Sequence, residues 1–267
     1  MSYNQNEAKL FASLKLSASD LHSLLNKLVR IRDAFHMQEH ETRKMTLADL
    51  YFATSLSCRL HKIEEIPKEI EVLTNLQVLD LDHNSISVIP DSISKLENLK
   101  VIRMDNNQLT EIPSSISKLQ NLEQLYFSHN QISDMSAVKD LPKLKRLYLS
   151  GNQITKIPHS ITSLVSLEFL YLRSNQINEF PVFLTKLENL SKLELESNNI
   201  TKLPKEVVNM TALTIFDVSN NKITTVPEMC SMKELSALYL DKNPIKYYPK
   251  NMNKDIMPNL QIYVVNV

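Results

Sequence analysis

The sequence predicts an α/β repeat solenoid with a helical cap at its N-terminal end. Three observations carry this prediction. A unit of 23 residues recurs from residue 53 onward, each copy opens with alternating apolar residues, and the first 52 residues follow a helical period instead. Self-similarity at such a period is typical of stacked units that share one continuous core. We therefore divide the chain into a helical cap, residues 1–52, and a repeat domain, residues 53–267, with nine units and a final strand.

The cap is predicted from two amphipathic segments. The stretch SDLHSLLNKLVRIRDAF, residues 19–35, places six apolar side chains on one helical face: Leu21, Leu24, Leu25, Leu28, Ile31 and Phe35. Thr46 and Asp49 have the spacing of a capping box that opens a second helix, with Leu47, Leu50 and Tyr51 turned inward. Because a repeat array exposes its first apolar layer unless something covers it, we expect these helices to cover the first unit. A separate partner-docking helix is the alternative.

The repeat units are visible when the copies are aligned. One copy reads LKRLYLSGNQITKIPHSITSLVS from Leu144, and its alternating Leu147 and Leu149 predict a short strand with one buried face. Between the nine units the step is 23 residues, shortened to 22 after Leu122 and Leu213. The units begin at Ala53, Leu76, Leu99, Leu122, Leu144, Leu167, Leu190, Leu213 and Leu235, and LQIYVVNV from Leu260 supplies the final strand.

The turns must form almost without glycine, because Gly151 is the only glycine of the chain. An asparagine ends the strand in eight of the nine units, and His61 takes its place in the first. Asparagine tolerates left-handed backbone, and its amide satisfies neighbouring backbone groups, so the stacked copies predict a polar ladder. The ladder positions are Asn84, Asn107, Asn130, Asn152, Asn175, Asn198, Asn221 and Asn243. A proline follows six residues later in eight units, which predicts an irregular outer edge: Pro67, Pro90, Pro113, Pro158, Pro181, Pro204, Pro227 and Pro249.

The consensus LxxLxLxxNxIxxIPxxIxxLxx closely resembles the leucine-rich repeat, in its intracellular 23-residue form with IP in each unit. The resemblance covers residues 53–267. It implies a leucine-rich-repeat horseshoe with a parallel β-sheet on the concave face and 3₁₀ or short helical turns outside. The 23-residue units resemble those of the Ras-group scaffolds, and the two 22-residue units resemble those of phosphatase-regulating relatives. Either subfamily implies a binding platform that is not an enzyme.

Composition excludes several functions. Lys plus Arg and Asp plus Glu are both 30, and this balance argues against a nucleic-acid partner. A single glycine excludes phosphate-binding loops, dinucleotide fingerprints and the nucleophile elbow, each of which needs several. Two cysteines exclude a multi-cysteine zinc site. We expect no catalytic residue, no cofactor and no metal.

The location is predicted from what the chain lacks. No apolar run reaches the roughly 18 residues of a membrane span. The start, MSYNQNEAKLFASLKL, has no basic flank before a long apolar core, so we expect no signal peptide. Cys58 and Cys230 form no disulfide framework. We expect a cytoplasmic protein, with the nucleus also open.

Strand alternation predicts which side chains line the concave face. The third, fifth and seventh positions of each unit should point to solvent. Three tyrosines then stack on successive strands about 4.8 Å apart, with arginines around them and acidic groups on either side. Exposed clusters of tyrosine and arginine are typical of binding hot spots, whereas isolated tyrosines simply favour strands. The predicted partner-binding residues are Tyr126, Tyr148, Phe169, Tyr171, Arg103, Arg146, Arg173, Glu194, Glu196, Asp217 and Tyr239, with Asp80, Asp82 and Asp105 on the other flank.

The predicted function is that of an adaptor that holds a folded protein on this face, in signalling. The resemblance suggests two partners, a type 1 protein phosphatase catalytic subunit or a Ras-like small GTPase, and the alternating acidic and aromatic groups favour the phosphatase. A recognition domain that serves an enzyme, or a microbial effector that targets a host protein, is the alternative of another class. Self-association through the final strand, Leu260 to Val267, is also open, because an unpaired edge invites pairing.

Overall fold

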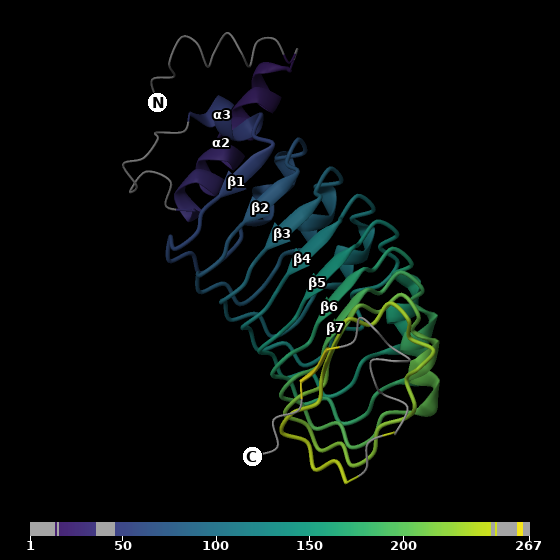
Figure 1. Ribbon diagram of the computed structural model, residues 1–267. Coiled ribbons are helices and arrows are strands. Elements are labelled where there is room, and N and C mark those ends of the chain that lie inside the picture. The colour runs from purple at the N-terminus through teal and green to yellow at the C-terminus, as the bar shows by residue number, and fades with distance from the viewer. Residues whose placement is uncertain (1–13, 15, 36–45, 247–248, 250–260, 264–267) are drawn as a thin grey trace.

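In the computed structural model, short parallel strands lie side by side along the molecule (Figure 1). Helices cover the end of the sheet at which β1, the first strand, lies (Figure 1). The structure describes residues 14, 16–35, 46–246, 249 and 261–263. Within them, ten strands form one parallel sheet in strict chain order. The strands are β1 Ser55–Ser57, β2 Val78–Asp80, β3 Val101–Arg103, β4 Gln124–Tyr126, β5 Arg146–Tyr148, β6 Phe169–Tyr171, β7 Lys192–Glu194, β8 Ile215–Asp217, β9 Ala237–Tyr239 and β10 Gln261–Tyr263.

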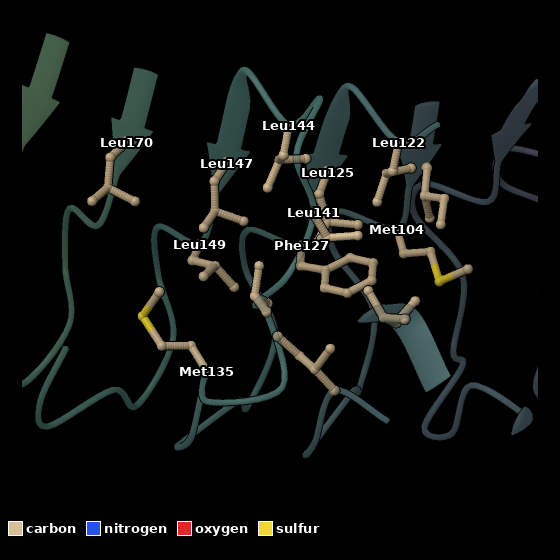
Figure 2. Packing of buried hydrophobic residues seen from close by; sticks show 14 of the residues in the cluster. Met104, Leu122, Leu125, Phe127, Met135, Leu141, Leu144, Leu147, Leu149 and Leu170 are labelled. Carbon is tan, nitrogen blue, oxygen red and sulfur yellow. The ribbon is translucent and has the colours of Figure 1, made fainter. Parts of the chain in front are cut away.

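Each unit contributes one leucine-rich layer to a continuous core. Neighbouring strands pair in register, so Leu147 of β5 lies between Leu125 of β4 and Leu170 of β6. In the close-up of the packing, Leu147 and Leu149 extend into the interior beside Phe127 (Figure 2). The core runs without a break from Leu25 in the cap to Leu240 in the ninth unit. The predicted repeat solenoid with a parallel sheet is therefore confirmed.

The outer side carries short 3₁₀ helices, each of which begins directly after the proline of its unit. Proline suits this position for two reasons. Its fixed φ is compatible with the start of a helix, and the N–H group that it lacks would have no partner within the helix there. The helices are η1 Lys68–Val72, η2 Asp91–Lys95, η3 Ser114–Lys118, η4 His159–Ser163, η5 Val182–Lys186 and η6 Lys205–Asn209.

In the part of the chain that the structure describes, the two 22-residue units have no 3₁₀ helix between their strands, β4 to β5 and β8 to β9. The missing residue falls in the outer turn: Met135 and Val138 are three residues apart, whereas Ile157 and Ile161 of the next unit are four apart. Met135 is fully buried, and so is Met229 of the other short unit. A flexible methionine fills the irregular space that the shorter turn leaves in the core.

The asparagine ladder forms as predicted. The Asn152 side chain is buried, and its Nδ2 donates to the carbonyl oxygens of Phe127 at 2.9 Å and Leu149 at 3.0 Å. Its Oδ1 accepts from the backbone N–H of Ile132 at 2.9 Å. The same pattern repeats from Asn84 to Asn243. Each asparagine thus joins two consecutive units.

The prediction that these asparagines supply the left-handed backbone is wrong. The residue that is left-handed in every unit is the one before the ladder position, for example His129 with φ 56° and Gly151 with φ 66°, and Lys62 and Asp140 are left-handed in addition. In most units its N–H donates to a carbonyl of the next unit, as from His129 to Ser150 at 2.7 Å. This bond helps to hold a conformation that would otherwise be strained. The column reads Leu60, His83, Asn106, His129, Gly151, Ser174, Ser197, Asn220 and Lys242.

The cap helices are α2, Ala18–Ala34, and α3, Leu47–Tyr51. The capping box of Thr46 and Asp49 is confirmed. On α2, Leu28 and Ile31 are fully buried in the core that continues into the repeats. Two ion pairs join α2 to η1: Arg30 to Glu69 at 2.6 Å and Lys27 to Glu71 at 2.9 Å. The predicted cap residues 1–13, 15 and 36–45 lie outside the described residues, as do Leu260 and residues 264–267 of the predicted self-association strand.

Candidate functional site

Three tyrosines form a stacked column on the sheet face, which we define as the surface made by the outward side chains of the strands. Tyr126, Tyr148 and Tyr171 are direct register partners on β4, β5 and β6. Their ring centroids are 4.3 Å apart in both pairs, and their planes differ by 9° and 6°. Because parallel strands place equal positions about 4.8 Å apart, rings with the same orientation come into contact along the sheet.

A cation closes each end of the tyrosine column. The guanidinium carbon of Arg103 lies 4.0 Å from the ring centroid of Tyr126, and the Lys192 Nζ lies 5.1 Å from that of Tyr171. Such contacts stabilise a cation over the electron-rich face of the ring. Both faces of each ring are therefore covered from within the molecule. What remains for a partner are the ring edges and the hydroxyl groups.

The phenols of Tyr126 and Tyr148 stay neutral at physiological pH. Burial, followed by the neighbouring phenol of the column, raises the pKa of Tyr126 and of Tyr148. The Tyr126 hydroxyl donates to Gln124 Oε1 at 2.7 Å. The column is thus a row of stacked apolar rings that presents its hydroxyl groups along one edge.

The three predicted arginines take separate roles. Arg173 pairs with Glu196, with 2.9 Å between Nε and Oε2. Arg146 lies over the Phe169 ring at 5.0 Å, and Arg103 lies over Tyr126. Among the residues that the structure describes, neither Arg103 nor Arg146 has an ion pair or a hydrogen bond from its guanidinium. Two sets of guanidinium donors therefore face outward beside the column.

The acidic flank toward β2 is held by the backbone. Asp82 Oδ1 accepts from the N–H of Asp105 at 2.8 Å, and Asp105 Oδ1 accepts from the N–H of Ser128 at 2.6 Å. Burial, with the nearby Asp82 carboxylate, raises the pKa of Asp105 to about 6. Burial also raises the pKa of Asp82.

Three of the seventh positions are less exposed than predicted, whereas Arg59 and Arg173 are exposed. Asp82, Ser128 and Ser219 are buried there, although strand alternation alone would turn them to solvent. The physical reason is that each strand ends after its fifth position, so the seventh lies where the chain bends into the ladder. The Asp82 carboxylate also binds the backbone of the next unit, which draws it inward.

The acidic flank toward β8 is largely neutralised within the molecule. Glu194 pairs with Lys192 at 2.8 Å, and Glu196 pairs with Arg173. Asp217 Oδ1 accepts from the Ser219 hydroxyl at 2.6 Å. Burial raises the pKa of Glu196 and of Asp217.

Tyr239 does not join the tyrosine column. It lies on β9, three strands beyond Tyr171, and its register partner on β8 is Asp217. Lys192 and Gln124, in contrast, belong to the column's surroundings and were not predicted as site residues. Their signal in the sequence is their third position on the strands that carry or adjoin the tyrosines.

Two further properties concern the described part of the chain. No three His, Cys, Asp or Glu side chains gather there in a way that could hold a metal ion. None of its helices combines the length and the apolar character that crossing a membrane requires.

Known proteins resemble this chain in sequence and fold. The family model that describes a leucine-rich repeat region matches residues 27–148 and 126–263. A leucine-rich-repeat protein of Leptospira interrogans is 36% identical with a TM-score of 0.72, over 76% of this chain and 52% of that one.

Two plant receptor complexes are also similar. The ectodomain of the Arabidopsis thaliana receptor kinase GASSHO1/SCHENGEN3, in complex with CASPARIAN STRIP INTEGRITY FACTOR 2, is 28% identical with a TM-score of 0.67, over 76% of this chain and 25% of that one. The plant peptide hormone receptor RGFR1, in complex with RGF2, is 27% identical with a TM-score of 0.67, over 79% of this chain and 35% of that one. The chain thus spans about half the length of the Leptospira protein and less of the receptors. No curated protein matches the sequence.

Proposed function

The chain belongs to the leucine-rich-repeat family, and on that premise we propose that it is a scaffold without enzymatic activity that holds a protein partner on its sheet face. One observation carries the proposal. Three stacked tyrosines, closed by Arg103 and Lys192, form a rigid ridge at the middle of the sheet face. Tyrosine and arginine dominate binding hot spots because they combine a large contact area with directed hydrogen bonds.

The similar complexes support a polypeptide as the partner. RGFR1 is a peptide hormone receptor in complex with RGF2, and the GASSHO1/SCHENGEN3 ectodomain is in complex with CASPARIAN STRIP INTEGRITY FACTOR 2. A rigid ridge also lowers the entropic cost of binding, because side chains that are already stacked lose little freedom when a partner covers them.

For the partner itself we propose a type 1 protein phosphatase catalytic subunit, in signalling in the cytoplasm or nucleus. The two 22-residue units and the mixed acidic and basic groups of the sheet face support this choice. The 23-residue IP units support a Ras-like small GTPase as the second partner to test. The likeness to a Leptospira interrogans protein supports the third, a host protein recognised by a microbial protein.

The test replaces Tyr126, Tyr148 and Tyr171 together by alanine. Affinity capture from native lysate, and binding to a purified type 1 phosphatase catalytic subunit and a Ras-like GTPase, would be compared with wild type. We expect loss of detectable partner binding, because each anchoring ring contributes about 2 kcal/mol or more. Circular dichroism should show a folded variant, since the changes remove outward side chains.

The matched control is Lys156→Glu, an exposed outer-turn residue away from the column. It should bind as wild type does. A folded triple variant that retains every partner would contradict the proposal and move the binding surface to the cap or the outer turns.

A further inference from the structure

Resting on the proposed function, we infer that the sheet face recognises an acidic side chain of its partner, held over β4 between Arg103 and Arg146. The occupant is an extended protein segment that crosses the strands and carries this acidic residue. A basic residue lies two or three positions away, on the side that faces β2. Some polar groups around the tyrosine column have ion-pair or hydrogen-bond partners within the molecule and others do not, and this difference indicates what a partner must supply.

The column itself excludes a purely apolar mode of recognition. Tyr148 is covered on both faces by Tyr126 and Tyr171, and the outer faces of those two rings are covered by Arg103 and Lys192. An apolar or aromatic partner group therefore finds no open ring face to stack upon. The partner meets ring edges, hydroxyls and the cations beside them.

Two arginines supply the donors that an acidic group requires. Arg103, at the fifth position of β3, is the register partner of Tyr126, and Arg146, at the third position of β5, is the register partner of Gln124. The two arginines thus flank β4 from opposite sides, with the Arg103 guanidinium over Tyr126 and the Arg146 guanidinium beside the Phe169 ring of β6. Within the described residues neither meets a carboxylate at ion-pair distance. Guanidinium forks bind carboxylate and phosphoryl oxygens with paired, charge-assisted hydrogen bonds.

The other charged groups set the order of charges in the segment. Toward β7 and β8, Glu194 and Glu196 already have cationic partners, so they attract a cationic group of a ligand only weakly. Toward β2, Asp80, Asp82 and Asp105 have no cation at ion-pair distance within the described residues, although the charge of Arg103 acts on Asp82 and Asp105. A second acidic residue on that side would be repelled, whereas a basic residue would be attracted.

Strand spacing sets the distance between the two charges. Asp105 follows β3 and Asp80 lies on β2, one and two strands from β4, over which the acidic residue is held. At about 4.8 Å per strand, this is roughly 5–10 Å. An extended segment rises about 3.3 Å per residue, so the acidic and basic residues are two or three positions apart.

The experiment is a selection of random peptides of about twelve residues, displayed on phage, on the immobilised full chain. We expect enriched peptides to share an acidic residue with a basic one two or three positions away. A synthetic peptide of the enriched pattern should lose at least tenfold in affinity when its Glu becomes Gln. A phosphoserine in place of that Glu shows whether the partner presents a carboxylate or a phosphoryl group.

Protein variants locate the contact. Arg146→Gln should weaken the peptide at least tenfold, Arg146→Lys should restore part of the loss, and Lys156→Gln should have no effect. Asp80→Lys should weaken peptides that carry the basic residue and not those in which it is replaced by Ser.

Enriched peptides without an acidic residue, no enrichment at all, or unchanged affinity in Arg146→Gln would each overturn this inference. The proposed function is judged separately, by whether the triple tyrosine variant loses its native partner. A lost native partner together with a failed peptide selection would leave the scaffold function standing and reject the acidic segment.

Discussion

Asn152 is a buried amide whose hydrogen bonds all go to backbone groups of its own and the preceding unit. Replacing it by alanine leaves those N–H and C=O groups without a partner away from water. We expect Asn152→Ala to lower the free energy of unfolding by about 1–3 kcal/mol. Asn178 is exposed on the outer turn, and Asn178→Ala should change it by less than about 0.5 kcal/mol. Urea titration of both variants measures the difference, and equal losses would contradict the ladder's role in stability.

Asp105 makes the stability of the fold depend on pH. Its folded pKa, about 6, lies above its ordinary value of 3.8, because burial disfavours the charged form. A raised pKa stabilises the fold fully at low pH, and this contribution is lost as the pH rises through about 6. Asp105→Asn keeps an acceptor for the Ser128 N–H and removes the charge. It should therefore raise the free energy of unfolding by about 1–2 kcal/mol at pH 7.5, with part of the group open to solvent.

The advantage of Asp105→Asn over wild type should shrink as the pH falls below 6 and vanish near pH 4. Thermal melts of both proteins at pH 4, 6 and 7.5 give the comparison. Asp91→Asn, on the exposed outer turn, is the matched control and should show no such pH-dependent gain. An advantage of Asp105→Asn that is the same at pH 4 and pH 7.5 would show that the effect is not ionisation.

At the level of single residues, the sequence predicted the hydrogen-bonding role of side chains better than it predicted backbone conformation. The ladder amides were predictable because repetition at one position indicates a shared partner. The left-handed residue was assigned one position too late, because Leu, His, Ser and Lys occupy it in different units and none marks positive φ. Gly151 follows a different cause. A Cβ there would lie 2.6 Å from His129 Nδ1, a contact between units that no pattern within one unit reveals.

At the level of elements, α2 stabilises the first unit through both apolar contacts and charge. Glu69 on η1 is buried, and burial raises its pKa, but hydrogen bonds from its own backbone N–H and from Arg30 outweigh this and lower it. Leu28 is fully buried on the face of α2 that joins the core. The helix is therefore part of the packed structure rather than a free docking element.

Leu28→Ala should lower the free energy of unfolding by about 2–4 kcal/mol through lost burial and the cavity left behind. Because the units of a solenoid contact only their neighbours, the loss should fall first on the cap and the first units. Hydrogen exchange should speed up for amides of β1 and β2 and stay unchanged in β7 and β8. His22→Ala, on the exposed side of the same helix, is the control. Uniform acceleration along the chain would show instead that the array opens as one unit.

The helices, strands and turns were predictable wherever one local sequence pattern recurs from unit to unit. Strands, outer prolines and the capping box follow from local pattern, and all of them are observed. The absence of a 3₁₀ helix in the two short units has its signal in the 22-residue step, although the sequence alone did not say which element would be lost. The ion pairs between α2 and η1 join residues about 40 positions apart, and no local pattern predicts them.

Across the whole sheet, the tyrosine column was predictable and its surroundings were not. Register and strand spacing alone bring Tyr126, Tyr148 and Tyr171 together. Which cation covers a ring and which pairs with a carboxylate depends on the side-chain rotamers of residues such as Arg173 and Lys192, and alternation does not determine these. The sequence suggested two similar acidic flanks. In the structure, the flank toward β8 has cationic partners, whereas the flank toward β2 is held by backbone N–H groups.

The two cysteines report on opposite ends of the molecule. Cys58 follows β1, is 1% exposed, and has its pKa raised to about 12 by burial and by the Asp80 carboxylate. Cys230, between β8 and β9, is partly exposed. Seven strand spacings of about 4.8 Å separate their units, far beyond the roughly 7 Å that a disulfide allows between Cα atoms. We therefore expect no bridge between them under oxidising conditions, and a thiol reagent should modify Cys230 well before Cys58.

Labelling of Cys58 then requires opening of the first unit, and this makes the rate a measure of local stability. In Leu28→Ala, the Cys58 rate should rise at least tenfold while the Cys230 rate stays unchanged, because the damaged end opens without the rest. Cys230→Ser isolates the Cys58 signal and serves as the reference protein. If both thiols accelerate together in Leu28→Ala, the solenoid opens as a single cooperative unit, and the cap stabilises the whole sheet face rather than its first strands.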